Sequence, residues 1–206
     1  MRQTDNFWDS RAESYDDKIK KGDEYSKTLF EIKRHLKSSD VVLDFGCASG
    51  EFSLDIAADI TYLHGIDTSG RMIDLAKKKL QGRRHQNASF SHADLFDESI
   101  EKYRYSAVVA LNVLHLVDDL PAILDRLTDL LPPGGLLIST TPCLGERRKL
   151  LRATINIMSK VGVAPTVSDL TTAGLKQMIT ESQFELVETA IHNEAFSELW
   201  LVARKT

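Results

Sequence analysis

Three aspartates stand at the ends of apolar segments, where a carboxylate is well placed to bind a ligand. Asp44 lies almost at the end of residues 41–45, Asp67 ends residues 61–67, and Asp94 ends a segment that begins at Ala88. Apolar segments that alternate with helix-like segments predict parallel strands, and ligands bind at the carboxyl ends of such strands. The sequence therefore predicts a ligand site that contains several carboxylates.

A glycine-containing turn follows the first of these segments. Residues 46–50 read Gly-Cys-Ala-Ser-Gly, and residues 52–60 supply an apolar helix face, so the unit is strand, tight turn and helix. A dinucleotide-binding pattern that starts at Gly46 would place Ala48 and Glu51 at its second and third glycines. Asp44 and Glu51 flank the turn, which disfavours a pyrophosphate. These acids favour a ligand with positive charge, such as the sulfonium and α-ammonium of S-adenosylmethionine.

The spacing of Asp67 is the most specific feature of the sequence. In nucleotide-binding sheets, a carboxylate about 20 residues past the glycine turn accepts hydrogen bonds from ribose hydroxyls. Thr68 comes next, and the following helix-like segment brings Met72 near the same ligand in its first turn. The spacing therefore predicts a ligand that contains a nucleoside.

Three segments resemble class I S-adenosylmethionine-dependent methyltransferases. LDFGCASG resembles the glycine-rich first motif of this family, with Ala48 in place of a third glycine. GIDTSGRM resembles the usual continuation G-I-D-x-S-x-x-M, and WDSRAESYD is similar to a segment of small-molecule methyltransferases of the quinone-biosynthesis type. The resemblance covers the chain except for residues 142–169.

The resemblance implies S-adenosylmethionine as the cofactor and gives roles to the matching residues. The glycine turn would hold the methionine moiety, Asp67 the ribose, and Asp94 with the backbone amide of Leu95 the adenine. Structural roles remain open beside these, with Met72 as core filling, Tyr15 as the anchor of a surface helix and Asp94 as a helix N-cap. The residues expected to bind the cofactor are Tyr15, Asp44, Gly46, Cys47, Ala48, Gly50, Asp67, Thr68, Met72, Asp94, Leu95 and Asn112.

The candidate catalytic residues are His115 and Tyr15. Residues 112–115 follow an apolar segment typical of a central parallel strand, and they lack the Asp/Asn-Pro-Pro-aromatic element of DNA amino-methyltransferases. An oxygen or nitrogen acceptor must lose a proton, which His115, Tyr15 or Cys143 can assist. His115 is equally expected as a structural or cofactor-pocket histidine, and a strong catalytic residue is not required because the sulfonium supplies the reactivity.

The whole chain, residues 1–206, reads as one domain with an α/β doubly wound fold. We expect a Rossmann-like sheet of seven mostly parallel strands with an antiparallel last strand, and two helices within residues 1–40. Residues 142–169 are too long for a plain connection and predict a helical insertion that covers the substrate. Its basic cluster is either a site for an anionic molecule or a solvated helix face, and consists of Arg147, Arg148, Lys149 and Arg152.

Composition limits the partners. The formal net charge of −4 disfavours nucleic acid as a partner. The two cysteines lack metal-ligand spacing, so no metal site is expected, and no apolar run is long enough to span a membrane. A cytoplasmic location and a small-molecule methyl acceptor are the resulting expectations. The acceptor, its reacting atom and the oligomeric state are left open by the sequence.

Two alternative functions are compatible with these residues. A nicotinamide-dependent oxidoreductase would also use an acid such as Asp67, although Glu51 and the missing third glycine oppose it. A non-catalytic S-adenosylmethionine-binding module on the same scaffold is the second alternative. Measurement of which cofactor binds distinguishes a methyltransferase from the oxidoreductase. Consumption of S-adenosylmethionine in the presence of candidate acceptors distinguishes a methyltransferase from the non-catalytic module.

Overall fold

Seven strands form one sheet in the order β3-β2-β1-β4-β5-β7-β6. The computed structural model describes residues 7–19, 23–84, 86–101, 104–146 and 167–206. The strands are β1 (Val41–Phe45), β2 (Tyr62–Asp67), β3 (Ala88–His92), β4 (Ala107–Leu111), β5 (Leu136–Pro142), β6 (Phe184–Asn193) and β7 (Glu198–Lys205). Neighbours among β1 to β5 pair in parallel, whereas β7 is antiparallel to both β5 and β6. The predicted seven-stranded sheet with an antiparallel last strand is confirmed.

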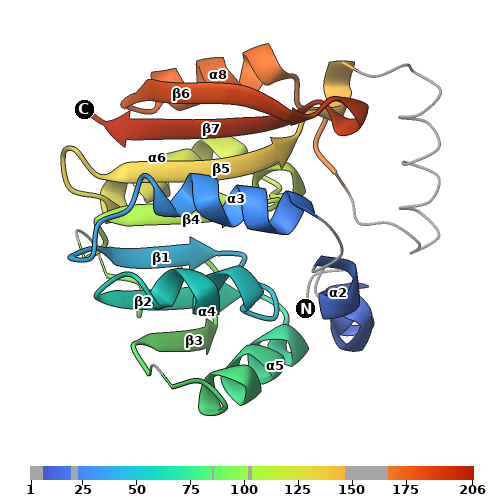
Figure 1. Cartoon of the computed structure of the whole chain (residues 1–206). Coiled ribbons are helices and arrows are strands. Elements are labelled where there is room, and N and C mark those ends of the chain that lie inside the picture. Colours follow the sequence, from blue (N-terminus) through green and yellow to red (C-terminus); the bar gives the residue numbers. More distant parts are fainter. Residues whose placement is uncertain (1–6, 20–22, 85, 102–103, 147–166) are drawn as a thin grey trace.

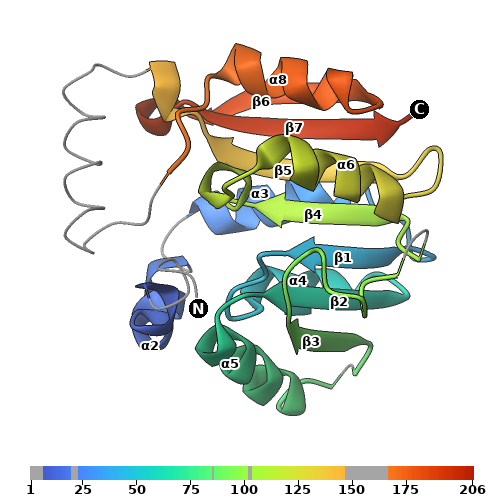
Figure 2. The same ribbon diagram turned by 180° about the vertical axis from the view of Figure 1, so that it is seen from behind.

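Helices cover both faces of the sheet. α3 and α4 lie in front of it in Figure 1, and α6 and α8 lie in front in the reverse view of Figure 2. The α-helices are α2 (Ala12–Ile19), α3 (Asp23–Lys33), α4 (Glu51–Ala57), α5 (Gly70–Gln81), α6 (Leu120–Leu130) and α8 (Thr172–Glu181). Short 3-10 helices are η1 (Leu114–Leu116), η2 (Leu144–Glu146) and η3 (Glu194–Phe196). This doubly wound arrangement buries one apolar cluster on each face of the sheet.

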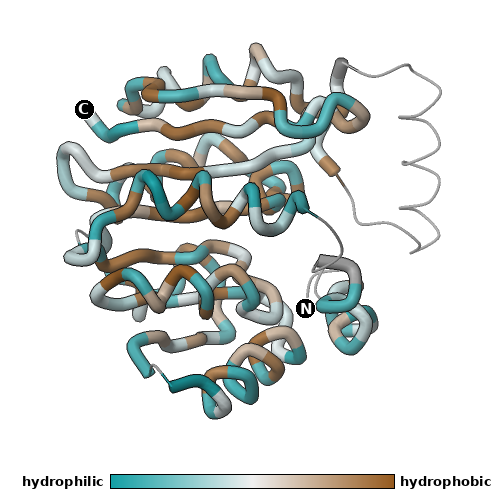
Figure 3. The backbone as a smooth tube through the Cα atoms, in the orientation of Figure 1, coloured by the Kyte–Doolittle hydropathy of each residue, from teal (hydrophilic) through white to brown (hydrophobic). Residues whose placement is uncertain are grey.

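The central strands are apolar because both of their faces are covered. All but the last residue of β4 are buried, and β7 contributes the fully buried Trp200. Figure 3 shows hydrophobic residues along the strands and polar residues on the outer sides of the helices. The run that predicted a central parallel strand therefore forms one.

The end of β3 differs from the prediction. β3 ends at His92 and not at Asp94, because its partner β2 ends at Asp67, which is opposite His92. The amide of Ala93 donates the last bond of this ladder to the carbonyl of Asp67 at 3.1 Å. Asp94 consequently lies on the loop beyond the strand.

The amino-terminal helices lie beyond and beside the sheet. Residues 7–9 form a helical turn before α2, and Figure 1 shows α2 beyond the arrowheads of β1 and β2. α3 packs on the sheet face instead, with Ile32 fully buried. The two predicted helices are therefore present: α2 lies beyond the carboxyl ends of the strands, and α3 covers one face of the sheet.

Most of the predicted insertion lies outside the described residues, which resume at residue 167. The expected helix and the basic cluster both fall within residues 147–166. Its described ends meet the carboxyl edge of the sheet, where the amide of Ser168 donates to the carbonyl of His115 at 2.7 Å and the amide of Gly145 to Leu170 at 2.7 Å. Within the described part of the chain, no helix is both long and apolar enough to cross a membrane.

Candidate functional site

The turn after β1 is held in a tight shape by its glycines. Gly46 has φ +76°, and a Cβ there would lie 2.7 Å from Cγ2 of Val113. Gly50, at φ +77°, is the residue immediately before α4, and a Cβ there would lie 2.9 Å from atoms of Ala76 and Phe90. Ala48 also has a positive φ, +47°, which a residue with a side chain adopts at a cost. The two glycines are therefore required by packing against the protein itself.

Asp67 connects this turn to α5. One oxygen of its carboxylate accepts a hydrogen bond from the amide of Ala48 at 2.9 Å, and the other accepts from the amide of Ser69 at 2.8 Å. Ser69 in turn caps α5 by accepting from the amide of Met72 at 3.2 Å. A carboxylate has about four lone-pair positions, and the two amides occupy one position on each oxygen.

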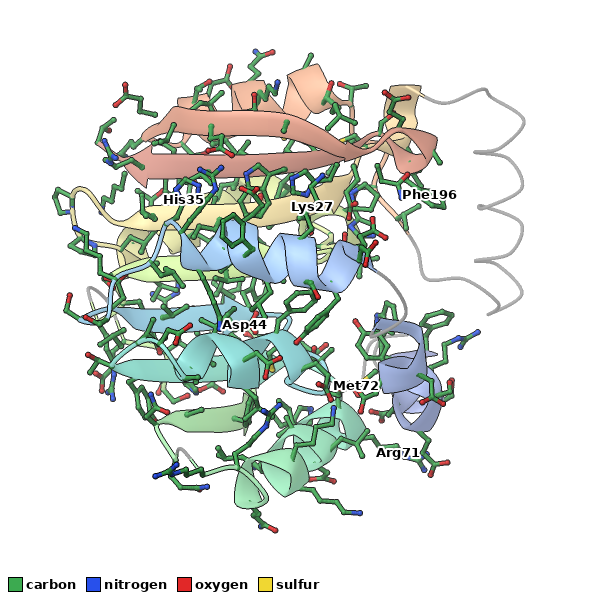
Figure 4. All side chains as sticks on the ribbon, in the orientation of Figure 1. Lys27, His35, Asp44, Arg71, Met72 and Phe196 are labelled. Atoms are coloured by element: carbon green, nitrogen blue, oxygen red, sulfur yellow. The ribbon has the colours of Figure 1, made fainter. Side chains whose placement is uncertain are left out.

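Asp44 is a buried carboxyl directly behind the turn. Its side chain lies on β1, as Figure 4 shows, and accepts a hydrogen bond from the hydroxyl of Ser53. Burial raises its pKa to about 7, with a smaller contribution from the charge of Asp67, although the Ser53 bond lowers it. Burial also raises the pKa of the neighbouring Cys47 thiol well above its usual value, so this thiol is protonated at neutral pH.

Glu51 was expected from the sequence to offer its charge to the ligand, but in the structure it pairs with a lysine. Its side chain is 5% exposed in the first turn of α4, and Oε1 lies 2.6 Å from Nζ of Lys79. The same ammonium lies 2.5 Å from Asp16 of α2 and donates to the carbonyl of Ser49 at 3.0 Å. Lys79 therefore balances the charge of Glu51, and Asp44 remains the acid of the turn that can respond to a ligand.

Asp94 and Leu95 begin the loop after β3. Oδ1 of Asp94 accepts from the amide of Phe96 at 2.8 Å, and the Leu95 side chain is buried. Arg126 of α6 donates to the carbonyl of Leu95 at 3.1 Å, which fixes the backbone at this point. Met72, labelled next to α2 in Figure 4, is also buried and lines the same cavity as Asp94 and Leu95, described below.

The segment after β4 carries Asn112 and His115. Asn112 has φ +53°, its amide donates to the carbonyl of Thr140 at 2.8 Å, and its side chain hydrogen-bonds Glu198. His115 is 9% exposed, and its Nδ1 is shielded from solvent with no hydrogen-bond partner among the described residues. Burial lowers the pKa of His115 to about 4, so its imidazole is neutral at neutral pH.

The amino-terminal segment places two aromatic rings at the site. Trp8 and Tyr15 meet edge to face with centroids 6.0 Å apart. Burial, followed by the charges of Asp67 and Asp44, raises the pKa of Tyr15 to about 12, so the phenol stays protonated and can donate a hydrogen bond. Asp9, just before α2, accepts from the hydroxyl of Ser69 at 2.5 Å and the amide of Arg71 at 3.3 Å.

These elements enclose a cavity of about 470 Å³ at the carboxyl edge of β1, β2 and β4. Both aromatic rings, the turn and the loops after β2, β3 and β4 line it. The predicted residues on its wall are Tyr15, Gly46, Ala48, Asp67, Thr68, Met72, Asp94, Leu95, Asn112 and His115. The structure therefore brings together residues from five separate parts of the sequence.

A second cavity of about 460 Å³ adjoins the first. Tyr15, Gly46, Ala48 and Asn112 line both cavities, and Asp44 and Cys47 line only the second. Of the residues predicted to bind the cofactor, Gly50 lines neither cavity because it faces Ala76 and Phe90. Gly50 shapes the turn from behind, and its position argues for a packing role.

Part of the wall of the second cavity consists of residues that the sequence did not indicate. Glu24 and Tyr25 come from α3, and Phe196 and Glu198 come from the β6–β7 connection and the start of β7. Glu198 reaches the cavity because β7 pairs with β5, with Glu198 opposite Pro142. No local sequence signal indicates this strand order, so these residues could not have been found without the fold. In the described part of the chain, no group of three or more His, Cys, Asp or Glu side chains could hold a metal ion.

Sequence comparisons identify relatives of the part of the chain that carries the turn and the first strands. Residues 43–137 match a family model described as a methyltransferase domain. An uncharacterized methyltransferase of Mycobacterium tuberculosis is 31% identical over 100 residues, which are 48% of this chain and 49% of the relative. The chain thus spans about half the length of the curated relatives that it first matches.

Solved structures share the fold at low sequence identity. A putative methyltransferase of Haloferax volcanii, solved in complex with the Trm112 methyltransferase activator, has a TM-score of 0.73 at 14% identity, with 96% of each chain covered. An S-adenosylmethionine-dependent methyltransferase of Methanosarcina mazei has a TM-score of 0.70 at 20% identity, with 85% of this chain and 96% of the other covered. The sheet described above is thus the Rossmann-like sheet of these methyltransferases.

Proposed function

We propose that the chain is a class I S-adenosylmethionine-dependent methyltransferase that transfers a methyl group to a small-molecule acceptor. The match of residues 43–137 to a methyltransferase-domain model and the fold shared with S-adenosylmethionine-dependent methyltransferases support this proposal. One observation carries this proposal: a single cavity is lined by the turn after β1, by Asp67 at the end of β2 and by Asp94 and Leu95 after β3. These groups suit the methionine, ribose and adenine parts of one ligand.

The residues present fit the cofactor. Both oxygens of Asp67 are oriented by backbone amides, and a carboxylate can accept hydrogen bonds from two ribose hydroxyls at once. Asp44 has a raised pKa behind the turn, and a positively charged ligand next to it would favour its ionised form. The apolar side chains of Met72 and Leu95 offer surfaces on which an adenine can pack. When bound, S-adenosylmethionine supplies an electrophilic methyl group on a sulfonium.

His115 and Tyr15 are the side chains that we assign to proton handling. The neutral imidazole of His115 can accept a hydrogen bond or a proton from an acceptor group that reaches the first cavity, which is the one of the two that His115 lines, although its low pKa makes it a weak base. The protonated Tyr15 hydroxyl can donate a hydrogen bond and lies on the wall that both cavities share. The remaining contribution of the protein is alignment of the acceptor and exclusion of water.

The adjoining second cavity supports a small molecule as the acceptor. Its volume of about 460 Å³ is within the usual range of small-molecule sites, roughly 300–1,000 Å³. It meets the first cavity at Tyr15, Asn112 and the glycine turn, which is where the methionine end of the cofactor would lie. An acceptor in the second cavity would therefore reach the methyl group.

The test is calorimetric titration of the purified protein with S-adenosylmethionine, S-adenosylhomocysteine and NAD in separate experiments. We expect saturable binding of both adenosyl compounds and none of NAD. Binding of NAD alone would favour a nicotinamide-dependent oxidoreductase and contradict the proposal. Formation of S-adenosylhomocysteine in the presence of candidate acceptors then distinguishes an enzyme from a non-catalytic binding module.

A further inference from the structure

The second cavity extends past the glycine turn to α3 and the start of β7. Glu24, in the first turn of α3, and Glu198, the first residue of β7, line this end of it. The antiparallel pairing of Glu198 with Pro142 of β5 fixes the backbone of Glu198 at the carboxyl edge of the sheet. This end lies beyond the residues assigned above to the cofactor, so it is available to the acceptor.

Among the described residues, every charged side chain that lines the second cavity is acidic. These side chains belong to Glu24, Asp44, Glu51 and Glu198. Asp44 accepts a hydrogen bond from Ser53, and Glu51 is balanced by Lys79. Among the described residues, Glu24, Asp44 and Glu198 form no ion pair, and of these three Glu24 and Glu198 lie at the end of the cavity formed by α3 and β7. Lys27, one turn after Glu24 on α3, is labelled in Figure 4 and does not line the cavity.

Glu24 and Glu198 affect each other electrostatically. Burial raises the pKa of Glu198, and the negative charge of Glu24 raises it further, whereas the hydrogen bond from Asn112 lowers it. Glu24 is exposed and Glu198 is half-buried. Their like charges repel, and a cation that contacts both would relieve the repulsion. The geometry is therefore more favourable to a positively charged occupant than to a neutral or anionic one.

Aromatic rings complete this end of the cavity. Tyr25 and Phe52 have ring centroids 4.4 Å apart, and the Tyr25 hydroxyl is engaged with Asp55 at 2.8 Å and with the carbonyl of Glu51 at 3.2 Å. Phe196 of η3 is 54% exposed, which is high for a phenylalanine on a cavity wall. Carboxylates combined with aromatic rings are the usual surroundings of an organic ammonium group.

We propose that the methyl acceptor is a small organic amine, bound as its ammonium between Glu24 and Glu198 with its apolar part against Tyr25, Phe52 and Phe196. The proposal rests on the methyltransferase function proposed above. In the reaction, the ammonium gives one proton to a cavity carboxylate. The freed nitrogen lone pair forms a bond to the methyl carbon, the carbon–sulfur bond breaks, and its electron pair stays on sulfur.

The test compares three probes of similar size with different charge. Protein saturated with S-adenosylhomocysteine is titrated with 2-phenylethylamine, 2-phenylethanol and phenylacetate, and ligand-observed NMR gives each affinity. We expect the amine to bind at least about tenfold more tightly than the alcohol and the acid. The preference should fall below about threefold in Glu198→Gln and in Glu24→Gln, and in wild-type protein it should weaken as salt rises from about 0.05 M to about 0.5 M.

Controls separate this proposal from the cofactor proposal. Glu194→Gln, on exposed η3 but outside the cavity wall, should keep the preference. The affinity for S-adenosylhomocysteine should stay unchanged in Glu24→Gln and Glu198→Gln. Equal affinity for the three probes, or no detectable binding of any, would overturn the amine proposal while leaving cofactor binding intact. Loss of S-adenosylhomocysteine binding in both variants would assign the carboxylates to the cofactor and also overturn it.

Discussion

At the scale of single residues, the role of each acid in the site depends on which group its carboxylate contacts. Asp67 accepts from two backbone amides, Asp44 from one hydroxyl, and Glu51 meets an ammonium. The spacing along the chain predicted that these acids lie near one ligand, because strand ends converge at one edge. It could not predict that Lys79 of α5 balances Glu51, since that contact depends on how α4 and α5 pack. The acids therefore have different roles despite their similar positions.

Ala48→Gly is expected to stabilise the protein. Ala48 has φ +47°, a conformation that costs an alanine about 1–2 kcal/mol and a glycine almost nothing. Glycine also makes the unfolded chain more flexible, which offsets part of the gain. We expect the free energy of unfolding in urea to rise by roughly 0.5–1 kcal/mol. The matched control is Ala122→Gly within α6, which should lower the same quantity by about 0.5–1 kcal/mol; destabilisation by both substitutions would contradict the strain argument.

Asp44→Asn is expected to change how stability depends on pH. The pKa of Asp44 is about 7 in the folded protein, against about 3.9 in an unfolded chain. The folded state therefore holds the proton more tightly, so the contribution of Asp44 is fully present below pH about 4 and is lost as the pH rises to about 7. Relative to the variant, the ligand-free wild type should lose roughly 2–4 kcal/mol of unfolding free energy across this range.

Urea unfolding of the two proteins at a series of pH values measures this difference. Asparagine can still accept the hydrogen bond of Ser53, so the variant should keep the local structure. A difference between the two proteins that stays constant from pH 4 to pH 8 would show that Asp44 ionises normally in the folded state.

At the scale of elements, α2 is attached to the site by polar contacts. Asp16 of α2 meets Lys79 of α5 and the hydroxyl of Ser49 in the turn, and Asp9 meets Ser69. These contacts tie the segment that carries Trp8 and Tyr15 to both the turn and α5. The sequence indicated helices here through their apolar spacing, but the polar attachment follows from the fold.

Lys79→Met is expected to destabilise the protein by about 2–4 kcal/mol in urea unfolding. The substitution removes the ammonium that meets Asp16 and the buried Glu51, and a buried carboxylate that loses its cation is costly. Lys78→Met is the matched control, because Lys78 is the adjacent, exposed residue of α5 and should change stability by less than about 0.5 kcal/mol. If the added substitution Glu51→Gln recovers none of the lost stability, Glu51 is not the residue that Lys79 stabilises.

At the scale of the whole molecule, the strand order could be predicted in part. Alternation of strands and helices predicted the doubly wound sheet, and apolar composition predicted the buried β4. β7 lies between β5 and β6 because it pairs with β5, which is far from it in sequence. The local pattern of apolar and polar residues does not predict such a pairing. The unpredicted wall of the second cavity, with Glu24 and Glu198, follows from this arrangement.

Hydrogen exchange should report which parts of the molecule respond to the cofactor. α2 and residues 112–116 line the first cavity at its edge, so S-adenosylhomocysteine should slow amide exchange in both. α8, which packs on the sheet next to β6 and lines neither cavity, serves as the internal control. Slower exchange in α8 with no change in α2 would mean that the ligand binds elsewhere.

The central claim is that Asp67 binds the ribose of an adenosyl cofactor in the first cavity. The most direct measurement is calorimetric titration of S-adenosylhomocysteine into the wild type, Asp67→Ala and Asp74→Ala, with thermal unfolding used to establish that each protein is folded. Asp74 is exposed on α5 and lines neither cavity. We expect Asp67→Ala to weaken binding by at least about tenfold, because it removes a charged hydrogen-bond acceptor, and Asp74→Ala to leave it unchanged. Equal affinity of the folded Asp67→Ala variant and the wild type would contradict the account.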